Sequence, residues 1–202
     1  MLYTGTIYPR GYHNPEPLYA ALAKRKAKGM RSVRVLFYGH CSKLPFLRDL
    51  ARTYGVEDAI VIPDEFLSRS DCIALQGEVD LLLHLSWTNP GMDGVLSAKV
   101  FEYMASGVPL LSIGAESDTA IGRLLEESGT GVCVGTDEQK VFEVLEIMAD
   151  QNEYPAWFKP NPVQIDTYSR ECQAARLLTL IKDANANLTY ESLAMEGEVQ
   201  SN

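Results

Sequence analysis

The sequence predicts an α/β protein built on one parallel sheet of about six strands, with helices on both faces. Three observations predict this class. Short runs of apolar or β-branched residues recur along the chain, helical patterns separate them, and glycine follows several of those helices. Strands of a parallel sheet are buried on both faces and need crossover helices between them. With 202 residues, 46% of them hydrophobic, the chain is long enough for one domain with a substantial core.

The expected strands are short runs of apolar, aromatic and β-branched residues, limited by turn-forming residues. The second run ends before Gly39, the third ends before Pro63, and the fifth begins at Pro109, so glycine and proline mark their limits. The strands are expected at residues 1–8, 33–38, 59–62, 79–85, 109–113 and 131–134.

Helical patterns fall between these runs, and most have a recognisable start or end. Asn14-Pro15 starts the first helix, while Gly55, Gly107 and Gly129 end the second, fourth and fifth. The sixth has an acidic first turn, which suits the positive end of its dipole. The helices are expected at residues 15–28, 44–54, 68–76, 97–106, 117–128, 137–149 and 167–183.

The C-terminal part of the chain changes in composition. Residues 150–163 hold three prolines and are expected to form a loop. Apolar residues recur from Ala174 to Ile181, through Leu177 and Leu178, which predicts an amphipathic last helix. Residues 184–202 are polar and acidic, so we expect them to be disordered. One domain is therefore expected over residues 1–183.

Charge and cysteine usage exclude several classes of function. The net charge of −9 argues against binding along a phosphate backbone, so no nucleic-acid partner is expected. Four widely spaced cysteines form no C-x-x-C pair, which predicts reduced thiols, a cytoplasmic location and no zinc site: Cys41, Cys72, Cys133 and Cys172. The start of the chain does not resemble a secretory signal, and no apolar run reaches the ~18 residues of a membrane span.

The most informative stretch runs from residue 91 to residue 110. Glu102 stands among apolar positions of a predicted helix, so we expect it to be buried and to need a partner. Gly91, Gly94 and Ser97, a plausible N-cap, begin that helix with free backbone N–H groups at the positive end of the dipole. Such a terminus favours an anion, and phosphate is the obvious candidate. A salt bridge between Glu102 and Lys99, three residues earlier, is the alternative.

Other candidate loops follow from the rule that ligands bind beyond the carboxyl ends of strands in open α/β sheets. After the first strand, Gly5 and Gly11 would let backbone approach a ligand, and Arg10 could pair with phosphate. A plain turn is the alternative reading of this loop. After the third strand, Ile62 and Pro63 offer backbone groups that could read the edge of a base.

Aromatic and histidine residues at the same edge carry weaker signals. Trp87 could line a pocket or pack into the core, and the sequence favours neither. His13, His40 and His84 are more simply explained as solvated or hydrogen-bonded imidazoles than as catalytic bases.

One longer pattern carries a resemblance to a known family. It reads Ser97-x-Lys99-x-x-Glu102-Tyr103-Met104-Ala105-x-Gly107-x-Pro109 and resembles the signature of retaining glycosyltransferases of family 4, which have the GT-B fold. Residues 3–8, 78–83, 129–132 and 168–178 are also similar to segments of that family, so the resemblance spans about residues 2–183. A GT-B enzyme has two Rossmann-like domains and roughly twice this length. The chain thus resembles the C-terminal, donor-binding half, without the acceptor half.

The resemblance implies a site for a nucleotide sugar. The acid at the Glu102 position would hold the ribose hydroxyls, and the turn before it would give backbone amides to the diphosphate through Asp93, Gly94, Val95 and Leu96. Where the family often has a second acid, eight residues before the first, this chain has Gly94, with Asp93 beside it. Thr6 takes the place of an arginine that often follows the first strand, so Arg10 and Lys99 are the candidate cations for the diphosphate.

The implied reaction is transfer of a glycosyl group from a nucleotide sugar with retention of configuration, within polysaccharide biosynthesis. It needs no metal or other cofactor, and the chain has no D-x-D metal signature. The isolated half would bind nucleotide weakly and transfer nothing, and any association with a membrane surface would come through the missing half.

Three alternatives remain open at the level of the sequence. The first is a non-catalytic α/β nucleotide-binding or regulatory module, which would explain the missing second acid. The second is another GT-B enzyme, such as a sugar-nucleotide epimerase. The third is a split transferase whose acceptor half is a separate partner chain.

Overall fold

Six parallel strands form one sheet in the computed structural model, as the sequence predicts. They are β1 (Leu2–Thr4), β2 (Val35–Tyr38), β3 (Ile60–Val61), β4 (Leu82–Leu85), β5 (Leu110–Ile113) and β6 (Gly131–Cys133). Their order across the sheet is β3-β2-β1-β4-β5-β6. Thr4 pairs with Tyr38 of β2, and Leu2 pairs with both Leu36 and Leu82. The chain therefore adds β2 and β3 on one side of β1. It then returns to the other side of β1 with β4 and continues outward to β5 and β6.

The structure describes residues 1–8, 12–40, 45–89, 91–92, 94–150 and 154–199, with residues 186–199 described by their backbone alone. The chain divides into two compact units, Met1–Asn161 and Pro162–Asn202. The expected domain boundary after residue 183 stays a prediction.

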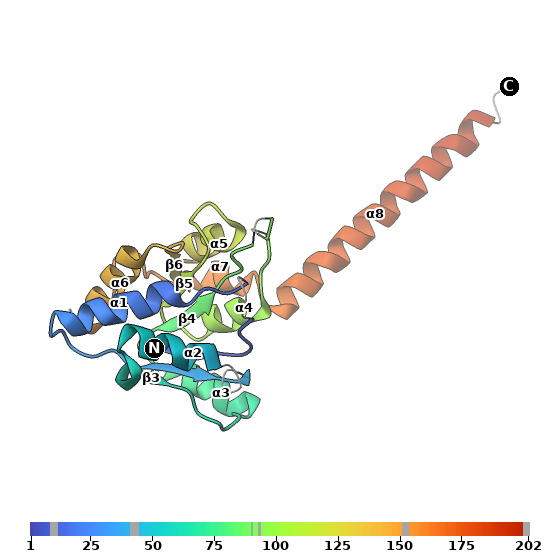
Figure 1. Cartoon of the computed structure of the whole chain (residues 1–202). Coiled ribbons are helices and arrows are strands. Elements are labelled where there is room, and N and C mark those ends of the chain that lie inside the picture. The colour runs from blue at the N-terminus through green and yellow to red at the C-terminus, as the bar shows by residue number, and fades with distance from the viewer. Residues whose placement is uncertain (9–11, 41–44, 90, 93, 151–153, 200–202) are drawn as a thin grey trace. The chain divides into compact units, whose positions relative to one another are not determined.

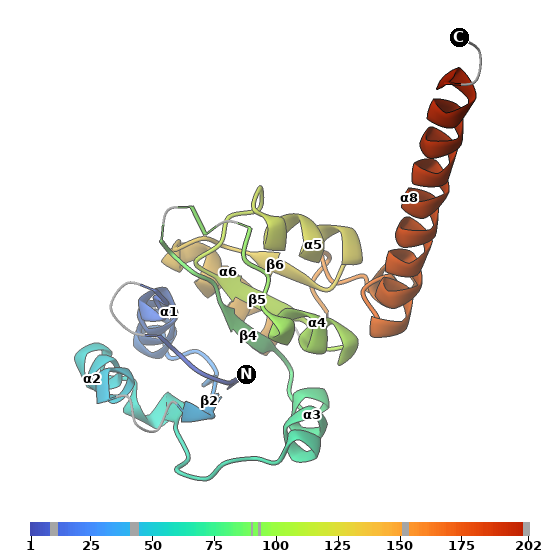
Figure 2. The ribbon, with the colours of Figure 1, turned by 90° about the vertical axis from the view of Figure 1, so that its right-hand side faces the viewer.

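Helices cover both faces of the sheet in the first unit (Figures 1 and 2). One face carries α1 and α2 and the other carries α3 and α4, while α6 packs beside α1. The helices are α1 (Glu16–Ala27), α2 (Pro45–Tyr54), α3 (Arg69–Gly77), α4 (Ala98–Ala105), α5 (Ala120–Ser128) and α6 (Glu138–Asp150), and a 3-10 helix, η2 (Glu57–Ala59), precedes β3. This arrangement is a Rossmann-like α/β fold, and it confirms the predicted class.

Most predicted elements exist, and the differences lie at their ends. The first strand stops at Thr4 and does not reach residue 8, because Gly5 adopts a φ of +116°. The Gly5 N–H donates to the Tyr38 carbonyl oxygen at 2.9 Å and makes the last contact between β1 and β2. The fifth helix begins after Thr119 rather than at Ser117, because the Thr119 Oγ1 accepts the Gly122 N–H at 3.2 Å and caps the helix there.

A partly buried ion pair lies at the amino ends of the strands. Arg25 of α1 is 2% exposed, and its Nη1 and Nη2 donate to the two carboxylate oxygens of Asp150 at 3.0 and 3.1 Å. The same Nη2 donates to the Arg31 carbonyl oxygen at 2.9 Å. This bidentate pair joins the end of α1 to the end of α6 and fixes the position of the chain that enters β2.

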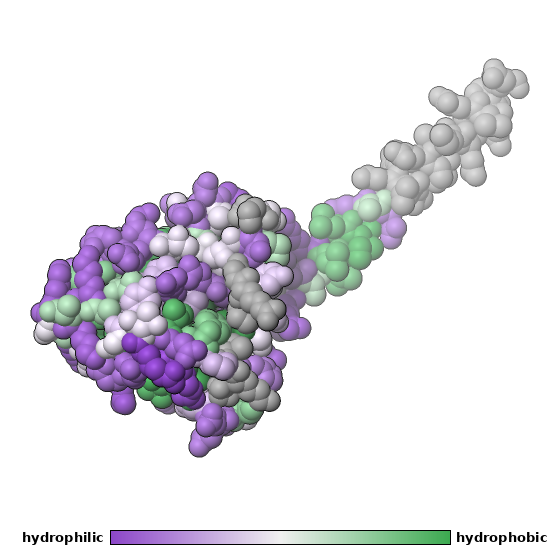
Figure 3. Space-filling model, viewed as in Figure 1, coloured by the Kyte–Doolittle hydropathy of each residue, from purple (hydrophilic) through white to green (hydrophobic). Residues whose placement is uncertain are grey.

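The second unit holds α7 (Pro162–Asp166) and α8 (Arg170–Val199). Helix α7 begins inside the segment expected to be a loop, because Pro162 suits the first position of a helix. Helix α8 runs to Val199, past the expected end at Asp183, while the disorder of residues 184–202 stays a prediction. Apolar side chains gather on its described part (Figure 3) and are exposed: Leu177, Leu178, Leu180 and Ile181.

Three cysteines lie among the described residues, and Cys72, Cys133 and Cys172 are all free thiols. Burial raises the pKa of the Cys133 thiol to about 11, so it stays protonated at neutral pH. Cys41 lies outside the described residues, and the cytoplasmic location stays a prediction. Among the described residues, no helix combines the length and hydropathy that crossing a membrane requires.

Candidate functional site

The site lies where the strand order reverses, between β1 and β4. The chain leaves β1 toward α1 on one face and leaves β4 toward α4 on the other. We call the region beyond the carboxyl ends of these two neighbours, where open α/β sheets bind ligands, the crevice. The described parts of two loops follow these strands, residues 5–8 and 12–13 after β1 and residues 86–89, 91–92 and 94–97 after β4. Both are segments in which the sequence predicts ligand contacts.

Gly5 makes the turn after β1 and leaves room for a lysine. A Cβ on Gly5 would stand 2.8 Å from the Nζ of Lys99, and a Cβ on Gly39 would stand 2.5 Å from the Gly5 carbonyl oxygen. Backbone and side-chain atoms of the same chain therefore lie close to Gly5, and the approach of a ligand to this backbone stays a prediction. In this structure the group that approaches it is the chain's own Lys99.

Lys99 brings a positive charge from α4 to the carboxyl end of β1. Its Nζ lies 3.9 Å from the centroid of the Tyr3 ring, a cation–π contact. Its charge also lowers the pKa values of His13 and His84. The ammonium group is thus close to both loops of the crevice and to the strands that carry them.

Two neutral histidines lie beside this lysine. Burial, with a smaller contribution from Lys99, lowers the pKa of His13 to about 4, and its Nδ1 accepts the Tyr8 N–H at 3.3 Å. Burial, then Lys99 and His13, lowers the pKa of His84 to about 3, and its Nδ1 lies 3.0 Å from the Ser112 hydroxyl. Both imidazoles are neutral at pH 7, so the positive charge among these three groups is that of Lys99.

Glu102 is exposed, which corrects the expectation that it is a buried acid. Its side chain is 42% exposed, and its Oε1 lies 3.3 Å from the Nη2 of Arg69 on α3. The core face of α4 is made by Val100, Tyr103 and Met104. Because Glu102 lies beside that face rather than on it, its carboxylate reaches α3 and solvent, and its ion-pair partner is Arg69 instead of Lys99.

The N-terminus of α4 faces the crevice with its backbone amides. The helical hydrogen bonds begin with the Val100 N–H, which donates to the Ser97 carbonyl oxygen at 3.0 Å, so the preceding amides have no acceptor within the helix. Ser97 is the N-cap residue by its backbone, but its side chain makes no capping bond, and its buried Oγ has no hydrogen-bond partner among the described residues.

The turn before α4 is only partly free to bind a ligand. The Val95 N–H already donates to the Met92 carbonyl oxygen at 3.0 Å, whereas the side chains of Val95 and Leu96 are exposed. Gly94 is exposed as well. Asp93, predicted to lie beside the diphosphate, falls outside the described residues, as does Arg10.

The other predicted residues, Thr6, Ile62 and Pro63, make hydrogen bonds within the chain or are at least half-buried. The Thr6 carbonyl oxygen accepts the Tyr3 hydroxyl at 2.7 Å. Ile62 is buried, and its carbonyl oxygen accepts from the Arg48 guanidinium at 3.2 Å, while Pro63 is half-buried. The ligand contacts expected of these three residues stay predictions.

A buried hydrogen-bond network that the sequence analysis missed aligns α4 with β1. The Tyr103 hydroxyl accepts the Thr4 N–H at 2.9 Å and lies 3.0 Å from the Thr4 Oγ1. Gln76 of α3 donates to the same Oγ1 at 3.4 Å. Burial raises the pKa of Tyr103, which keeps its hydroxyl protonated. Because these residues are far apart in the chain, no local pattern indicates their contact.

An aromatic cluster joins the two loops of the crevice. The Trp87 ring stacks on Tyr8 with centroids 5.5 Å apart, and it meets the edges of Tyr12 and His13 at 5.3 Å each. The Thr88 N–H donates to the Tyr12 carbonyl oxygen at 2.9 Å. Trp87 therefore packs the loop after β4 against the loop after β1, and its contact with a ligand stays a prediction.

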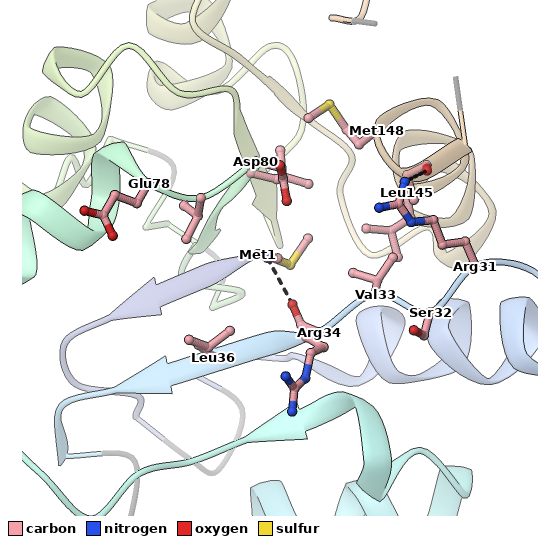
Figure 4. Close-up of a pocket in the computed structure, with 13 residues that line it drawn as sticks. Met1, Arg31, Ser32, Val33, Arg34, Leu36, Glu78, Asp80, Leu145 and Met148 are labelled. Atoms are coloured by element: carbon pink, nitrogen blue, oxygen red, sulfur yellow. Dashed lines mark hydrogen bonds between the residues drawn. The ribbon is translucent and has the colours of Figure 1, made fainter. Parts of the chain in front are cut away.

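A cavity lies at the opposite end of the sheet, at the amino ends of the strands (Figure 4). Its volume is about 380 Å³. The Met1 ammonium group lies there and donates to the Arg34 carbonyl oxygen at 3.0 Å. Burial lowers the pKa of this ammonium group, and the charge of Asp80 opposes that shift. Its charged groups thus interact with one another and with backbone. Among the described residues, no group of three or more potential metal ligands occurs.

Comparison with known proteins identifies the fold. No protein-family model and no curated protein matches the chain. It is similar to the solved structure of the lipopolysaccharide outer core galactosyltransferase WaaB in its apo form, with a TM-score of 0.64 and 17% identity over 91% of this chain and 48% of that one. It is also similar to sucrose-phosphate synthase from Thermosynechococcus elongatus, with a TM-score of 0.66 and 16% identity over 92% of this chain and 46% of that one.

A third similar structure contains a nucleotide sugar. It is HepE of Anabaena in complex with UDP-glucose, with a TM-score of 0.56 and 16% identity over 94% of this chain and 48% of that one. The chain thus spans about half the length of these structures, and its fold is that of one half of a GT-B glycosyltransferase.

Proposed function

We propose that this chain is the donor-binding half of a retaining glycosyltransferase of family 4, and that the crevice between β1 and β4 binds a nucleotide sugar. The observation that carries the proposal is the position of Lys99. Its ammonium group and the N-terminus of α4 meet at the switch point of the sheet. A cation and a helix N-terminus together form a site for a diphosphate.

The residues have separate roles in this proposal. Amides near Gly94, Leu96 and the first turn of α4 would bind the diphosphate, with Lys99 beside them. Glu102 would accept hydrogen bonds from the ribose hydroxyls, after exchanging its exposed contact with Arg69, which is 77% exposed, for the ligand. An exposed ion pair contributes little to stability, so this exchange costs little. The position of the nucleotide base, expected near Ile62 and Pro63, stays a prediction.

The chemical contribution of this half is stabilisation of the leaving group. When the glycosidic bond to the diphosphate breaks, negative charge grows on the phosphate oxygens. A fixed ammonium group and oriented amides stabilise that charge more strongly than they stabilise the bound donor. Activation of the acceptor would come from the other half, so we expect no transfer by this chain alone. The proposal needs no metal ion.

The test is a calorimetric titration with UDP, GDP and ADP, run on the wild-type chain and two variants. We expect saturable binding of one nucleotide, weakened about tenfold or more in Glu102→Ala and in Lys99→Met, because each loses charge-assisted hydrogen bonds. Glu127→Ala, which removes an exposed carboxylate of α5, is the matched control and should bind as the wild type does.

The outcomes separate the proposed function from its alternative. Binding that is unchanged in both variants would contradict the site and favour a nucleotide-binding or regulatory module that uses another surface. Glycosyl transfer by the isolated chain would contradict the assignment to a donor half alone.

A further inference from the structure

The two tryptophans of the chain differ in what they pack against. Trp157 packs against the hydrophobic core of the first unit. The Trp87 ring instead contacts loop residues, since it stacks on Tyr8 and meets the edges of Tyr12 and His13. Tyr8 is 47% exposed and Tyr12 is 45% exposed. The Trp87 cluster therefore lies at the surface, at the carboxyl ends of β1 and β4.

The loop after β1 is fixed at its start and at its end. At its start, a Cβ on Gly5 would stand 2.8 Å from the Nζ of Lys99. At its end, the His13 N–H donates to the Tyr8 carbonyl oxygen at 3.1 Å, and the Tyr8 N–H donates to the His13 Nδ1 at 3.3 Å. Because Trp87 contacts both Tyr8 and His13, it packs on this loop at the point where the loop closes.

The loop after β4 is bonded to the same part of the chain. At its start, the buried Ser86 donates its N–H to the Ile113 carbonyl oxygen of β5 at 2.8 Å. Two residues later, the Thr88 N–H and Oγ1 donate to the Tyr12 carbonyl oxygen at 2.9 and 3.3 Å. Trp87 lies between these two anchored residues, and the loop then leads to the N-terminus of α4. The Trp87 ring therefore sets the separation of the two loops.

Helix α4 is positioned by other contacts. The Tyr103 hydroxyl accepts the Thr4 N–H at 2.9 Å in the buried network that joins α4 to β1. Glu102 precedes Tyr103 on the same helix, so this network also places the carboxylate proposed for the ribose. The network and the Trp87 cluster consist of different residues. Removal of the Trp87 ring should therefore free the two loops and leave Glu102 in place.

We propose that Trp87 is a positioning residue for the diphosphate of the nucleotide sugar. It holds the loop after β1 against the loop after β4, so that backbone of both loops and the Lys99 ammonium group face the same phosphate groups. Loops that are already ordered lose less conformational entropy when they bind, which raises the affinity. The inference rests on the proposed function, because it concerns the diphosphate of that site.

The experiment compares nucleoside diphosphates with nucleosides on the whole chain. Calorimetry measures binding of UDP, GDP and ADP, and saturation-transfer NMR measures binding of uridine, guanosine and adenosine. The variants are Trp87→Leu, Trp87→Phe, Tyr8→Leu and the double variant Trp87→Leu/Tyr8→Leu. Two controls remove the same side chains elsewhere in the first unit. They are Trp157→Leu and Tyr154→Leu, the latter at a tyrosine that is 69% exposed.

We expect Trp87→Leu to weaken diphosphate binding about tenfold, because three ring contacts are lost, and to leave nucleoside binding unchanged. The ratio of the two affinities is decisive, since a purely structural defect would weaken both ligands by the same factor. Trp87→Phe keeps an aromatic ring and should retain most of the affinity. Tyr8→Leu should also weaken the diphosphate, and the double variant should lose no more than Trp87→Leu alone, because both changes remove one contact. Both controls should bind as the wild type does.

The proposal is overturned if Trp87→Leu weakens nucleoside and diphosphate equally, or if the effects of Trp87→Leu and Tyr8→Leu multiply in the double variant. If nucleosides bind too weakly for a ratio, the double variant alone decides. Diphosphate binding that depends on Lys99 and Glu102, without any effect of Trp87, would keep the proposed function and reject the positioning role. Diphosphate binding that is absent, or indifferent to Lys99 and Glu102, would contradict the proposed function and this inference with it.

Discussion

The two ends of the sheet use charge in different ways. At the amino ends, Arg25 and Asp150 neutralise each other through a bidentate contact, and the Met1 ammonium group donates to backbone. At the carboxyl ends, the Lys99 ammonium group lies over the Tyr3 ring, near two neutral histidines and a helix N-terminus. A cavity of about 380 Å³ lies at the amino ends, whereas the groups suited to an anion lie at the carboxyl ends. The cavity and the proposed anion site therefore lie at opposite ends of the sheet.

The largest expected effect tests the structural role of the amino ends. In Asp150→Ala the guanidinium of Arg25 stays buried without its carboxylate, which should lower the free energy of unfolding by about 3 kcal/mol. Urea denaturation measures this change. Asp58→Ala breaks an exposed pair with Lys26 and should change stability little. Equal effects of the two variants would show that the Arg25 pair is not structural. Nucleotide affinity of folded Asp150→Ala should match the wild type.

A smaller effect on stability, joined to a loss of binding, is expected at the carboxyl ends. In Gly5→Ala the new methyl group would meet Lys99 Nζ at 2.8 Å, and alanine would have to adopt a φ of +116°. We expect a loss of about 2 kcal/mol in the free energy of unfolding and weaker nucleotide binding, because the ammonium group is displaced. Gly29→Ala, at a φ of +63° with open space around it, is the control. It should cost about 1 kcal/mol and leave binding unchanged. Identical behaviour of the two variants would remove Gly5 from the site.

The smallest expected effect is a dependence of the free energy of unfolding on pH. The pKa values of His13 and His84 are lowered to about 4 and about 3, first by burial and then by nearby positive groups. The unfolded chain binds protons at these histidines below their ordinary pKa of about 6.5, while the folded chain does not. Their contribution to stability is therefore complete above about pH 6.5 and is lost as the pH falls toward about 4 and then 3.

Urea denaturation at about pH 7 and about pH 5 measures that contribution, since most carboxylates stay ionised across this window. His84→Asn should flatten the pH dependence, whereas His40→Asn, at an exposed position after β2, should preserve it. A slope that His84→Asn leaves unchanged would show that His84 is not the group that titrates.

Much of the fold could be predicted because its signals are local. Apolar runs, proline at helix starts and glycine at helix ends depend on neighbours within a few residues. These signals predicted the six strands and the first six helices in their observed order along the chain. Gly5 shows the limit of such signals. Its short strand ends at a positive φ that the apolar pattern of residues 1–8 conceals.

The sequence predicted several residues of the candidate site, but it did not predict which residues they contact. The sequence identified Gly5, Lys99 and Glu102, but it expected Glu102 to be buried and to have Lys99 as its alternative partner. The direction of each side chain depends on what packs around α4. Tyr3 attracts Lys99 across the sheet, and α3 brings Arg69 to Glu102.

The sequence by itself determined the alternation of strands and helices, the helix N-terminus near Ser97 and the positions of its turns, because hydrophobic period and backbone preference act over short distances. Only the tertiary structure decided that β1 lies beside β4, that Lys99 meets the end of β1, and that Trp87 stacks on Tyr8. The physical reason is that these contacts join segments far apart in the chain. Their geometry follows from the packing of helices on both faces of the sheet, which no local pattern contains.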